Sequence, residues 1–311
     1  MSNGFVKIFF VIVLAIFLGN NKNTIAQSMD DSKSNKNDFV EQSTRELEKA
    51  KKLKVKTRLR YAGFFDAEGK VPQKKSLVEK LTFDKNGNRK ELSRYIGDEI
   101  LDLRYIFLYD KKGRLLKMET RNASNVLVGK KECKYDKKGN EVERKLYDKK
   151  RGNMRIVFKY DKENNLIESE TFDKNKKSIG RYVNTFESGA VKTTTVLDKG
   201  GNVTREKWFI YNEAGKLIRE DFKDLSNSYS VKNKYDEKGN ISEVETPQTK
   251  RIVTYDDLQN IIEDRMFTSD GNRQYRVVFS YLENGLQNDE TRYDNSDKAA
   301  FHAQFKYEFY K

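Results

Sequence analysis

The pattern of hydrophobic and polar positions divides the chain into three parts. Residues 8–18 form an unbroken apolar run directly after Lys7. Residues 38–55 place apolar side chains at the spacing of one helix face, with acidic residues early and lysines late, which predicts one amphipathic helix. From residue 56 onward, short β-branched and aromatic stretches alternate with Asp, Asn and Gly, which predicts strands joined by tight turns.

The first part has the features of a signal peptide. Lys7 precedes an apolar run of 11 residues, and Thr24-Ile25-Ala26 offers small side chains at the cleavage positions. We therefore predict a signal peptide over 1–26, cleaved near Ala26, and a secreted, periplasmic or cell-surface location. An uncleaved N-terminal anchor is the alternative. The run is shorter than the ~20 residues of a membrane-spanning helix, so no stable membrane span is expected after cleavage. The polar residues 27–37 predict a flexible linker.

The strand region is a repeat anchored on an aromatic residue that precedes a turn. Phe83-Asp84, Tyr109-Asp110 and Tyr135-Asp136 each begin the pattern aromatic-Asp-x-x-Gly, at intervals of 26 residues. A weaker copy, such as Tyr147-Asp148, lies midway between two strong ones, so each unit holds two strands and two turns. Nine intervals then predict about 18 strands. The later strong positions are Tyr160, Phe186, Tyr211, Tyr235, Tyr255, Tyr281 and Tyr307.

The repeated motif is explained by turn chemistry. An Asp side chain accepts hydrogen bonds from the backbone that follows it, two permissive residues occupy the corner, and Gly supplies a positive φ. Where Gly is absent, Asn is expected to replace it, as at Asn164 and Asn260. Lysines inside the loops argue against calcium binding, so these turns predict no metal site.

The predicted fold class is all-β. It is a long antiparallel meander of about 18 short strands in repeated hairpins over 56–311, forming a twisted or curled sheet, with a short N-terminal helix over 38–55 that caps the first hairpin. The pattern itself leaves open whether such a sheet stays open, curls or closes. An open meander has two edge strands, which suggests that the protein could assemble through its sheet edges as a structural component of the cell envelope.

The units resemble the YD repeats of rearrangement-hotspot and wall-associated bacterial proteins. Tyr109-Asp110-Lys-Lys-Gly113-Arg114-Leu115 matches the core of that repeat, and the resemblance covers about 60–311. Large members of the family form β-sheet shells around a toxin. This chain is short, and Pro72 and Pro247 are its only prolines, so it lacks the Asp-Pro self-cleavage motif. The resemblance therefore implies the repeat architecture without the toxin or self-cleavage modules. A similarity to MORN-type repeats at Tyr281-Leu-Glu-Asn-Gly285 is weaker.

Composition narrows the class of protein further. Charged residues make up 35% and aromatic residues 12% of the chain, with 2 Pro, which favours a thin sheet with rings on one face and charge on the other over disorder. The net charge is +14, but 62 basic residues are mixed with 48 acidic ones. Such mixing is typical of a solvated strand face, and binding to an anionic polymer is the alternative. With a signal peptide, we expect no nucleic-acid partner.

Catalytic residue types are scarce. The chain has one Cys, Cys133, and one His, His302, which leaves a Cys or Ser nucleophile without a nearby base in sequence and offers no zinc set. We expect no enzyme, no catalytic residue, no cofactor and no metal. A hydrolase built on paired carboxylates, or an enzyme hidden in the irregular region 220–260, is the alternative.

We therefore predict a secreted, non-enzymatic repeat protein that acts as a binding or scaffold module at the cell envelope or outside the cell. A protein or polysaccharide partner fits this class, and the sequence leaves the oligomeric state open. The alternative is a carbohydrate-binding module that uses exposed Tyr and Phe rings, although Trp208 is the only tryptophan. Glycosylation sequons at Asn122, Asn202 and Asn240 are explained by the frequency of Asn.

Overall fold

The computed structural model describes residues 38–66, 69–70, 75–97 and 99–311. The predicted signal peptide, 1–26, and linker, 27–37, lie outside the described residues. The chain divides into two compact units, Met1–Glu41 and Gln42–Lys311, and the second carries all the features discussed below.

One helix and twenty strands make up the described residues. The helix α3 spans Asp38–Lys52, and Gly or Asn turns separate the strands at nearly every hairpin. The strands are β1 Val55–Phe64, β2 Ser76–Phe83, β3 Arg89–Ile96, β4 Ile100–Tyr109, β5 Leu115–Asn122, β6 Leu127–Tyr135, β7 Glu141–Asp148, β8 Gly152–Tyr160, β9 Leu166–Phe172, β10 Ser178–Glu187, β11 Ala190–Leu197, β12 Val203–Tyr211, β13 Leu217–Asp224, β14 Ser228–Tyr235, β15 Ile241–Glu245, β16 Thr249–Tyr255, β17 Ile261–Thr268, β18 Arg273–Tyr281, β19 Gln287–Tyr293 and β20 Ala299–Phe309.

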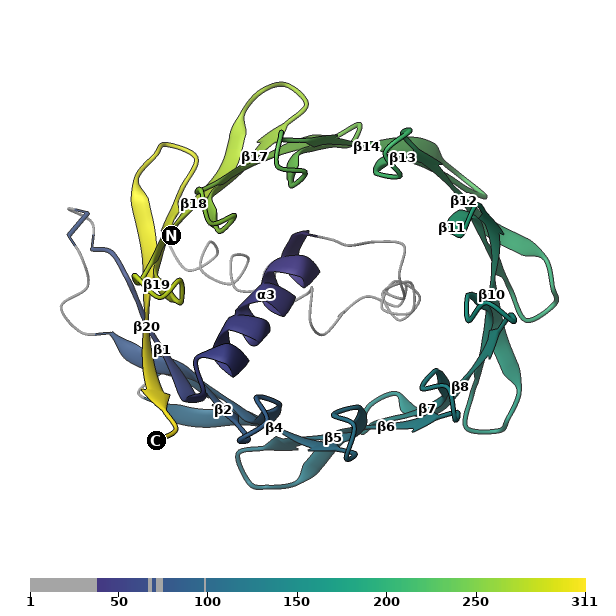
Figure 1. Cartoon of the computed structure of the whole chain (residues 1–311), viewed down its shortest axis with the longest axis horizontal. Coiled ribbons are helices and arrows are strands. Elements are labelled where there is room, and N and C mark those ends of the chain that lie inside the picture. The colour runs from purple at the N-terminus through teal and green to yellow at the C-terminus, as the bar shows by residue number, and fades with distance from the viewer. Residues whose placement is uncertain (1–37, 67–68, 71–74, 98) are drawn as a thin grey trace, which may run out of the picture. The chain divides into compact units, whose positions relative to one another are not determined.

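The strands close into a barrel. Each strand pairs antiparallel with the next along the chain, and β1 also pairs antiparallel with β20, from Val55 opposite Phe309 to Phe64 opposite Phe301. Figure 1 shows the resulting ring, with α3 inside it. The predicted twisted or curled open sheet is therefore wrong. Assembly through free sheet edges loses its basis as well, because all twenty strands have a neighbour on both sides.

The strand count of the meander is also corrected, from about 18 to 20. The nine intervals begin at Phe83 and end at Tyr307, so they contain β3 to β20. The first two strands, β1 and β2, precede the turn at Phe83-Asp84, from which the intervals are counted. The earlier turn at Phe65-Asp66 lies outside that count. Of the first two strands, β1 is the one that closes the barrel.

A repeated bulge accounts for the curvature. At most strong turns, the pairing register shifts by one residue at the aromatic position, as between Lys134 and Tyr135, where Tyr135 lies opposite Glu141 and Val142 is the extra residue. Similar shifts occur before Tyr109, Tyr160 and Tyr281. A β-bulge bends its strand and increases the local twist. Because the bulge recurs on the same side of successive hairpins, the bends add up around the sheet and let it close.

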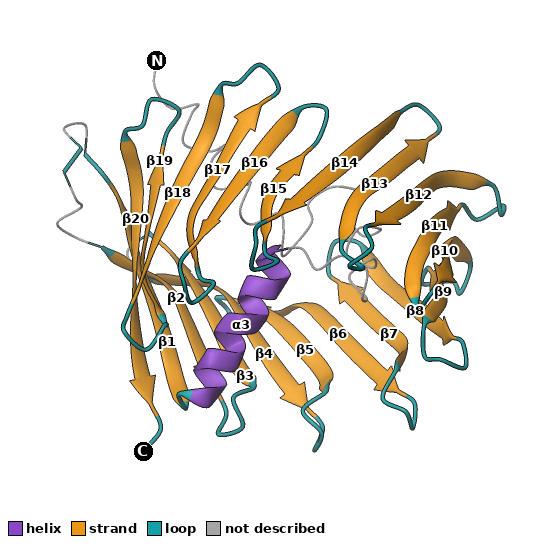
Figure 2. Cartoon of the chain, turned by 45° about the horizontal axis from the view of Figure 1, so that its top comes forward, coloured by secondary structure: helices purple, strands orange, loops and turns teal. Residues whose placement is uncertain are grey.

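The core under α3 joins the helix to the inner face of the barrel, which we define as the face that carries Leu81 and Phe83. The buried cluster consists of Ala50, Val55, Leu81, Phe83 and Leu286. Leu47 and Leu53 of the helix pack against it. Figure 2 shows α3 inside the ring of strands. The helix thus contacts β2 of the first hairpin, as a cap would, and also the turn before β19.

Candidate functional site

An Asp–Asn clasp holds half of the strong turns and the midway turn at Asp198. In the first turn, Asp84 Oδ1 accepts hydrogen bonds from the backbone N–H groups of Asn86 and Asn88, at 2.8 and 2.9 Å, and Asn88 Nδ2 donates to Asp84 Oδ2 at 3.0 Å. Gly87 has a φ of 79°. These contacts confirm the predicted turn chemistry. Five further turns repeat the clasp, at the pairs 136 and 140, 161 and 165, 198 and 202, 236 and 240, and 256 and 260.

The two positions expected to replace Gly have different outcomes. Asn164 has a positive φ of 66°, as predicted. In the later unit, Gln259 takes this conformation with a φ of 62°, so the prediction for Asn260 is wrong. Asn260 instead donates its side-chain amide to Asp256 Oδ2 at 2.7 Å. The pattern shows this in retrospect, because Gln259 is the third residue after Asp256, where the other turns have Gly.

Hydroxyl groups of the strong-turn tyrosines connect consecutive units. Tyr135 donates to the backbone carbonyl of Leu115 at 2.9 Å, which lies just after the preceding strong turn. Tyr310 donates to the carbonyl of Phe83 at 2.6 Å and so bridges the closure between β20 and β2. We call these hydrogen-bonded tyrosines the tyrosine belt. Their bonds to the backbone explain why an aromatic residue recurs at one position of each unit. The same bond to a carbonyl of the preceding unit is made by Tyr160, Tyr235, Tyr255, Tyr281 and Tyr307.

Because their rings are half-buried and their hydroxyls are used by the backbone, the belt tyrosines do not form an exposed aromatic stripe. We expect Tyr135→Phe to lower the free energy of unfolding by about 1 kcal/mol, since the Leu115 carbonyl loses its partner. Tyr229→Phe, at a ring that is 41% exposed, is the control and should change stability by less. Urea unfolding followed by circular dichroism measures both. Equal effects would contradict the belt.

The turn aspartates make stability depend on acid. Hydrogen bonds from the Asn202 side chain and backbone lower the pKa of Asp198, and the backbone N–H of Arg114 lowers that of Asp110. A carboxyl with a depressed pKa in the folded state contributes stability above its unfolded pKa, and this contribution is lost as the pH falls through the folded value. We therefore expect the urea midpoint to fall below about pH 4.

Replacing the turn Asp by Asn removes the titrating group and keeps the hydrogen-bond acceptor. The chain already contains such a turn, in which Asn212 Oδ1 accepts the backbone N–H of Lys216 at 2.9 Å. The double variant Asp110→Asn/Asp198→Asn should keep the turns and show a shallower loss of the urea midpoint between pH 4 and pH 2. An unchanged slope would mean that these turns do not set the acid response.

Helix α3 is fixed to the barrel through four strong turns. Arg45 Nη1 donates to the Gln259 carbonyl at 2.8 Å, and Arg45 Nη2 donates to Asn240 Oδ1 at 3.2 Å. Lys49 donates to Asn260 Oδ1 and, at 3.1 Å, to the Gly285 carbonyl. At the fourth turn, a Cβ on Gly87 would lie 2.6 Å from the Lys51 side chain, so only Gly allows this approach.

The irregular part of the repeat coincides with this docking. The unit around Tyr255 comes early, and its turn binds Arg45 and Lys49. In the next unit, Leu286 stands at the Asn position of the clasp and packs into the core under α3. A cavity of about 250 Å³ lies beside the helix, lined by Arg45, Glu48, Lys49, Lys52, Leu258 and Gln259.

Partly buried charge joins α3 to the closing strands. Arg58 on β1 contacts Glu46 of the helix at 3.4 Å and Glu79 on β2 at 2.8 Å. Burial raises the pKa of Glu46 despite the neighbouring Arg58. At Glu79, burial is outweighed by Arg58 and Arg60, so the pKa is lowered. Glu79 is therefore the fully ionised partner of Arg58, and Glu46 the weaker one.

A second ion cluster lies across the closure. Arg60 on β1 contacts Glu290 on β19 at 3.0 Å, and Arg292 contacts the same carboxylate at 2.6 Å. The guanidinium of Arg60 lies 5.7 and 5.8 Å from the ring centres of Phe301 and Phe305. These charges lie on the inner face. Arg58 is directly opposed to Leu81, which defines that face, and Arg60 is directly opposed to Glu79 two residues away.

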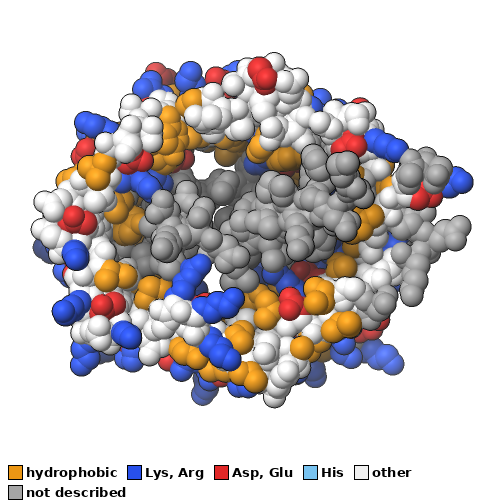
Figure 3. Space-filling model, turned by 180° about the vertical axis from the view of Figure 1, so that it is seen from behind, with side chains coloured by type: hydrophobic (Ala, Val, Ile, Leu, Met, Phe, Trp, Pro, Cys, Tyr) orange, Lys and Arg blue, Asp and Glu red, His pale blue; other side chains and the backbone are white. Residues whose placement is uncertain are grey.

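Apolar side chains continue along the inner face away from the helix. Directly opposed residues share a face, so the inner face can be followed from Arg94 to Leu103, and in the next row from Phe107 and Met118 through Lys131 to Leu146 and Met154. Lys131 is the one charged side chain in that row. Figure 3 shows hydrophobic side chains at the inner edge of the molecule, together with some charged ones, and many Lys, Arg, Asp and Glu side chains around the outer margin.

The outer face carries shared ion pairs. Glu143 contacts Lys134 at 2.9 Å and Arg155 at 2.6 Å. Glu243 contacts Lys234 and Lys250, each at 2.8 Å. Each carboxylate joins cations from two or three neighbouring strands. The outer face is therefore a charged, solvated surface, as the mixed charge pattern predicts.

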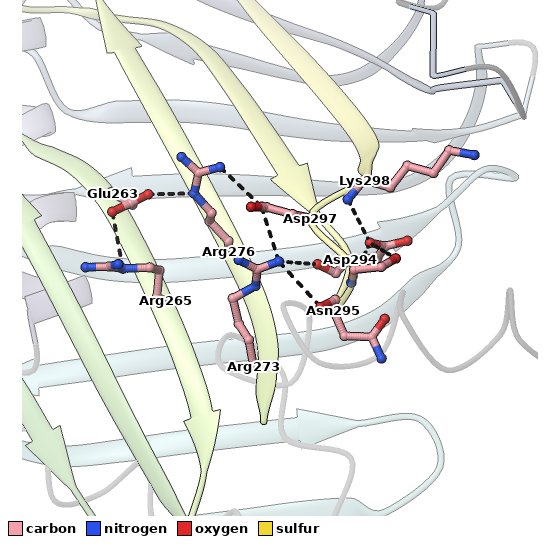
Figure 4. A network of polar contacts seen from close by, with 9 residues as sticks. Glu263, Arg265, Arg273, Arg276, Asp294, Asn295, Asp297 and Lys298 are labelled. Atoms are coloured by element: carbon pink, nitrogen blue, oxygen red, sulfur yellow. Dashed lines mark hydrogen bonds and ion pairs between the residues drawn. The ribbon is translucent and has the colours of Figure 1, made fainter. Parts of the chain in front are cut away.

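The most extended outer network lies at β17 to β20 (Figure 4). Arg265 and Arg276 are directly opposed like charges, and Glu263 contacts them at 3.2 and 2.6 Å. Asp297, in the turn before β20, contacts Arg276 at 3.3 Å and Arg273 at 3.2 Å. The shared carboxylates offset the repulsion between the arginines.

Cys133 is a structural residue in this fold. It faces Arg144 on the inner face and is 6% exposed. Burial raises its thiol pKa to about 11, so the thiol stays protonated at neutral pH and is a poor nucleophile.

His302 meets partners that sequence reasoning did not bring together. Its Nδ1 lies 3.2 Å from Thr291 Oγ1, and its Nε2 lies 3.3 Å from Asp289 Oδ1. Burial lowers the pKa of His302. Thr291 on β19 is directly opposite His302 on β20, and both side chains lie on the outer face. The bond between them holds the imidazole ring in place. Sequence distance left a nucleophile without a nearby base, whereas the structure places the Thr291 hydroxyl and the Asp289 carboxylate beside the His302 ring.

The remaining sequence candidates lie in ordinary positions. Trp208 is directly opposed to Thr193 and Asp221. Asn240 is buried in its turn and bonded to Asp236, which leaves no room for a glycan. Within the described ranges, no three His, Cys, Asp or Glu side chains are grouped so that they could hold a metal ion. In the same ranges, no helix has both the length and the apolar character needed to cross a membrane.

No family model matches the chain, and no curated protein does. Among solved structures, the chain is similar to the TcdB2-TccC3-Cdc42 structure, at 12% identity over 75% of this chain and with a TM-score of 0.44, and it spans 14% of that chain. A porin-like protein from Bacteroides uniformis is 10% identical, with 81% and 96% of the two chains covered and a TM-score of 0.39.

An outer membrane lipoprotein-sorting protein domain from Vibrio parahaemolyticus is 7% identical, with 86% and 92% of the two chains covered and a TM-score of 0.23. Likenesses at these TM-scores carry no argument about function. The resemblance to YD-repeat proteins accordingly stays at the level of the repeated turn.

Proposed function

We propose that the protein is a non-enzymatic binding protein of the cell envelope or extracellular space, whose ligand lies against the inner face of the barrel. The observation that carries this proposal is the difference between the two faces of the sheet, which is more apolar inside the barrel and more charged outside it. Phe107 and Met118 are opposed on the inner face, whereas Glu143 and its cations lie on the outer face.

A barrel whose outer face is charged and whose inner face carries apolar side chains suits water outside and an apolar or amphipathic ligand inside. A bilayer favours the opposite arrangement, with an apolar outer band. The inner wall also holds charged side chains near α3, which can orient a guest. Ligand sites are typically apolar with a few polar groups, as this face is.

The location and the absence of catalysis are parts of the proposal. The predicted signal peptide over 1–26 supports export. The protonated thiol of Cys133 supports a role other than catalysis. A polysaccharide ligand held by exposed rings is less well supported, because the belt tyrosines use their hydroxyls in backbone bonds.

A pair of adjacent residues on β4 tests the inner-face site. Phe107 lies on the inner face and Leu108 on the outer face, where it is 56% exposed. We expect an apolar fluorescent probe such as N-phenyl-1-naphthylamine to bind the purified protein and to be displaced by long-chain guests. Phe107→Asp should weaken probe binding at least tenfold, because a carboxylate would need solvation in the apolar wall.

Leu108→Asp should leave probe binding unchanged, and Phe107→Ala gives a milder inner-face variant in case the aspartate prevents folding. Circular dichroism establishes that each variant is folded. Equal loss in Phe107→Ala and Leu108→Asp, or no probe binding by the folded parent protein, would contradict an inner-face site.

A further inference from the structure

Four arginines lie around and beside Glu79 on the inner face. Arg60 and Arg94 are directly opposed to Glu79, Arg58 contacts its carboxylate at 2.8 Å, and Arg89 is directly opposed to Phe83 on the same face. Arg58 and Arg60 come from β1, and Arg89 and Arg94 come from β3. We call these four arginines the arginine sector.

The carboxylates near the arginine sector are already used. Glu79 and Glu46 contact Arg58, and Glu290 is shared between Arg60 and Arg292. None of the described carboxylates lies within ion-pair distance of Arg89 or Arg94. The sector therefore holds two cations, Arg89 and Arg94, that no described carboxylate contacts.

Several donor groups of the sector also lack partners. Among the described residues, no hydrogen-bond acceptor meets the buried Nε of Arg58, Arg60 and Arg89 or the buried Nη1 of Arg94. Most buried polar groups in proteins are hydrogen-bonded, so four orphan nitrogens in one place need an explanation. Burial and the nearby Arg58 lower the pKa of Arg89, which shows that its charge is poorly compensated.

Ion pairing with α3 accounts for only one of the four arginines of the sector. Glu46 of the helix reaches Arg58 at 3.4 Å, and none of the other described helix side chains forms an ion pair with these arginines. Arg94 instead lies over the Tyr105 ring, 5.4 Å from its centre. It is directly opposite Leu103, where the apolar wall begins.

We propose that Arg89 and Arg94, together with the orphan N–H groups of Arg58 and Arg60, bind the anionic head group of an amphipathic ligand. The head group is a carboxylate or phosphate, whose oxygens match the guanidinium fork. Its apolar chain lies along the inner wall from Leu103 and Phe107 toward Leu146. This inference rests on the proposed function and adds the chemical class of the ligand to it.

Paired ligands of equal chain length test the head-group site. Decanoate, decyl phosphate and 1-decanol are titrated into the protein expressed from its full sequence, with acetate and inorganic phosphate as anions that lack a chain. We expect decanoate and decyl phosphate to bind at least tenfold more tightly than decanol, and the short anions to bind far more weakly than either.

Variants assign this preference to the sector. Arg89→Gln and Arg94→Gln should each reduce the preference for decanoate over decanol about tenfold, while decanol affinity stays the same. Arg155→Gln, on the outer face, is the control and should leave the preference unchanged. Arg94→Lys keeps the charge and should retain most of the preference if the glutamine variant fails to fold.

The outcomes separate this inference from the proposed function. Equal binding of decanoate and decanol, or an unchanged preference in both glutamine variants, overturns the head-group site but leaves an apolar inner-face site standing. Short anions that bind as tightly as decanoate overturn the amphipathic ligand. Failure of every chain-bearing ligand to bind overturns the proposed function itself.

Discussion

Arg58→Ala should lower the free energy of unfolding by about 3–5 kcal/mol, the largest loss expected from any ion-pair change in this protein. Arg58 contacts Glu79 at 2.8 Å and Glu46 at 3.4 Å, and the Arg58 and Glu79 side chains are 22% and 16% exposed. Removing the guanidinium leaves the ionised Glu79 without its closest cation, and an uncompensated buried charge is costly. Urea unfolding at neutral pH measures the loss.

The control distinguishes a buried pair from a general effect of charge. Arg155→Ala removes an outer-face arginine that is 49% exposed, and it should change stability by less than about 1 kcal/mol. The double variant Arg58→Met/Glu79→Leu replaces the pair by apolar side chains and should recover much of the loss. Equal effects of the two alanine variants would contradict a buried charge cluster at the closure.

Phe83→Ala should lower the free energy of unfolding by about 3–5 kcal/mol. Phe83 is 3% exposed and packs with Ala50, Leu81 and Leu286 under α3, so its removal leaves a cavity between helix and wall. Phe186 occupies the same repeat position in another unit and is only half-buried. Phe186→Ala should cost clearly less, because no helix covers that position.

Thermal unfolding and urea unfolding of the two variants give the comparison. If Phe186→Ala costs as much as Phe83→Ala, the repeat position itself sets the cost, and the helix does not stabilise this side of the barrel.

Local chemistry made the turns predictable from sequence. Asp84, Gly87 and Asn88 each have a role that depends on residues at most four positions away, and the contacts of that turn agree with the prediction. The exceptions lie where a distant element intervenes. Gln259 adopts a positive φ in a turn whose carbonyl binds Arg45 of the helix, a contact between residues 214 positions apart.

Closure of the sheet was not predictable in the same way. The register of β1 with β20 depends on the sum of twist and bulge over all the hairpins between them, and no local motif encodes that sum. Once the ring is closed, the wall has an inside, and Arg58, Arg60, Arg89 and Arg94 meet there. The sequence shows these four only as ordinary members of a mixed charge pattern, so the candidate site could not be derived from it.

The most direct test of the account asks whether β1 and β20 are neighbours. In a Cys133→Ser background, Leu59→Cys and Lys306→Cys place thiols at directly opposed positions of β1 and β20. Opposed Cα atoms in an antiparallel pair lie about 4.5–5.5 Å apart, within the range for a disulfide. Leu59→Cys with Lys80→Cys, opposed within the first hairpin, is the positive control. The account predicts an intrachain disulfide in both proteins. A disulfide in the hairpin control but free thiols at 59 and 306 would contradict the closed barrel.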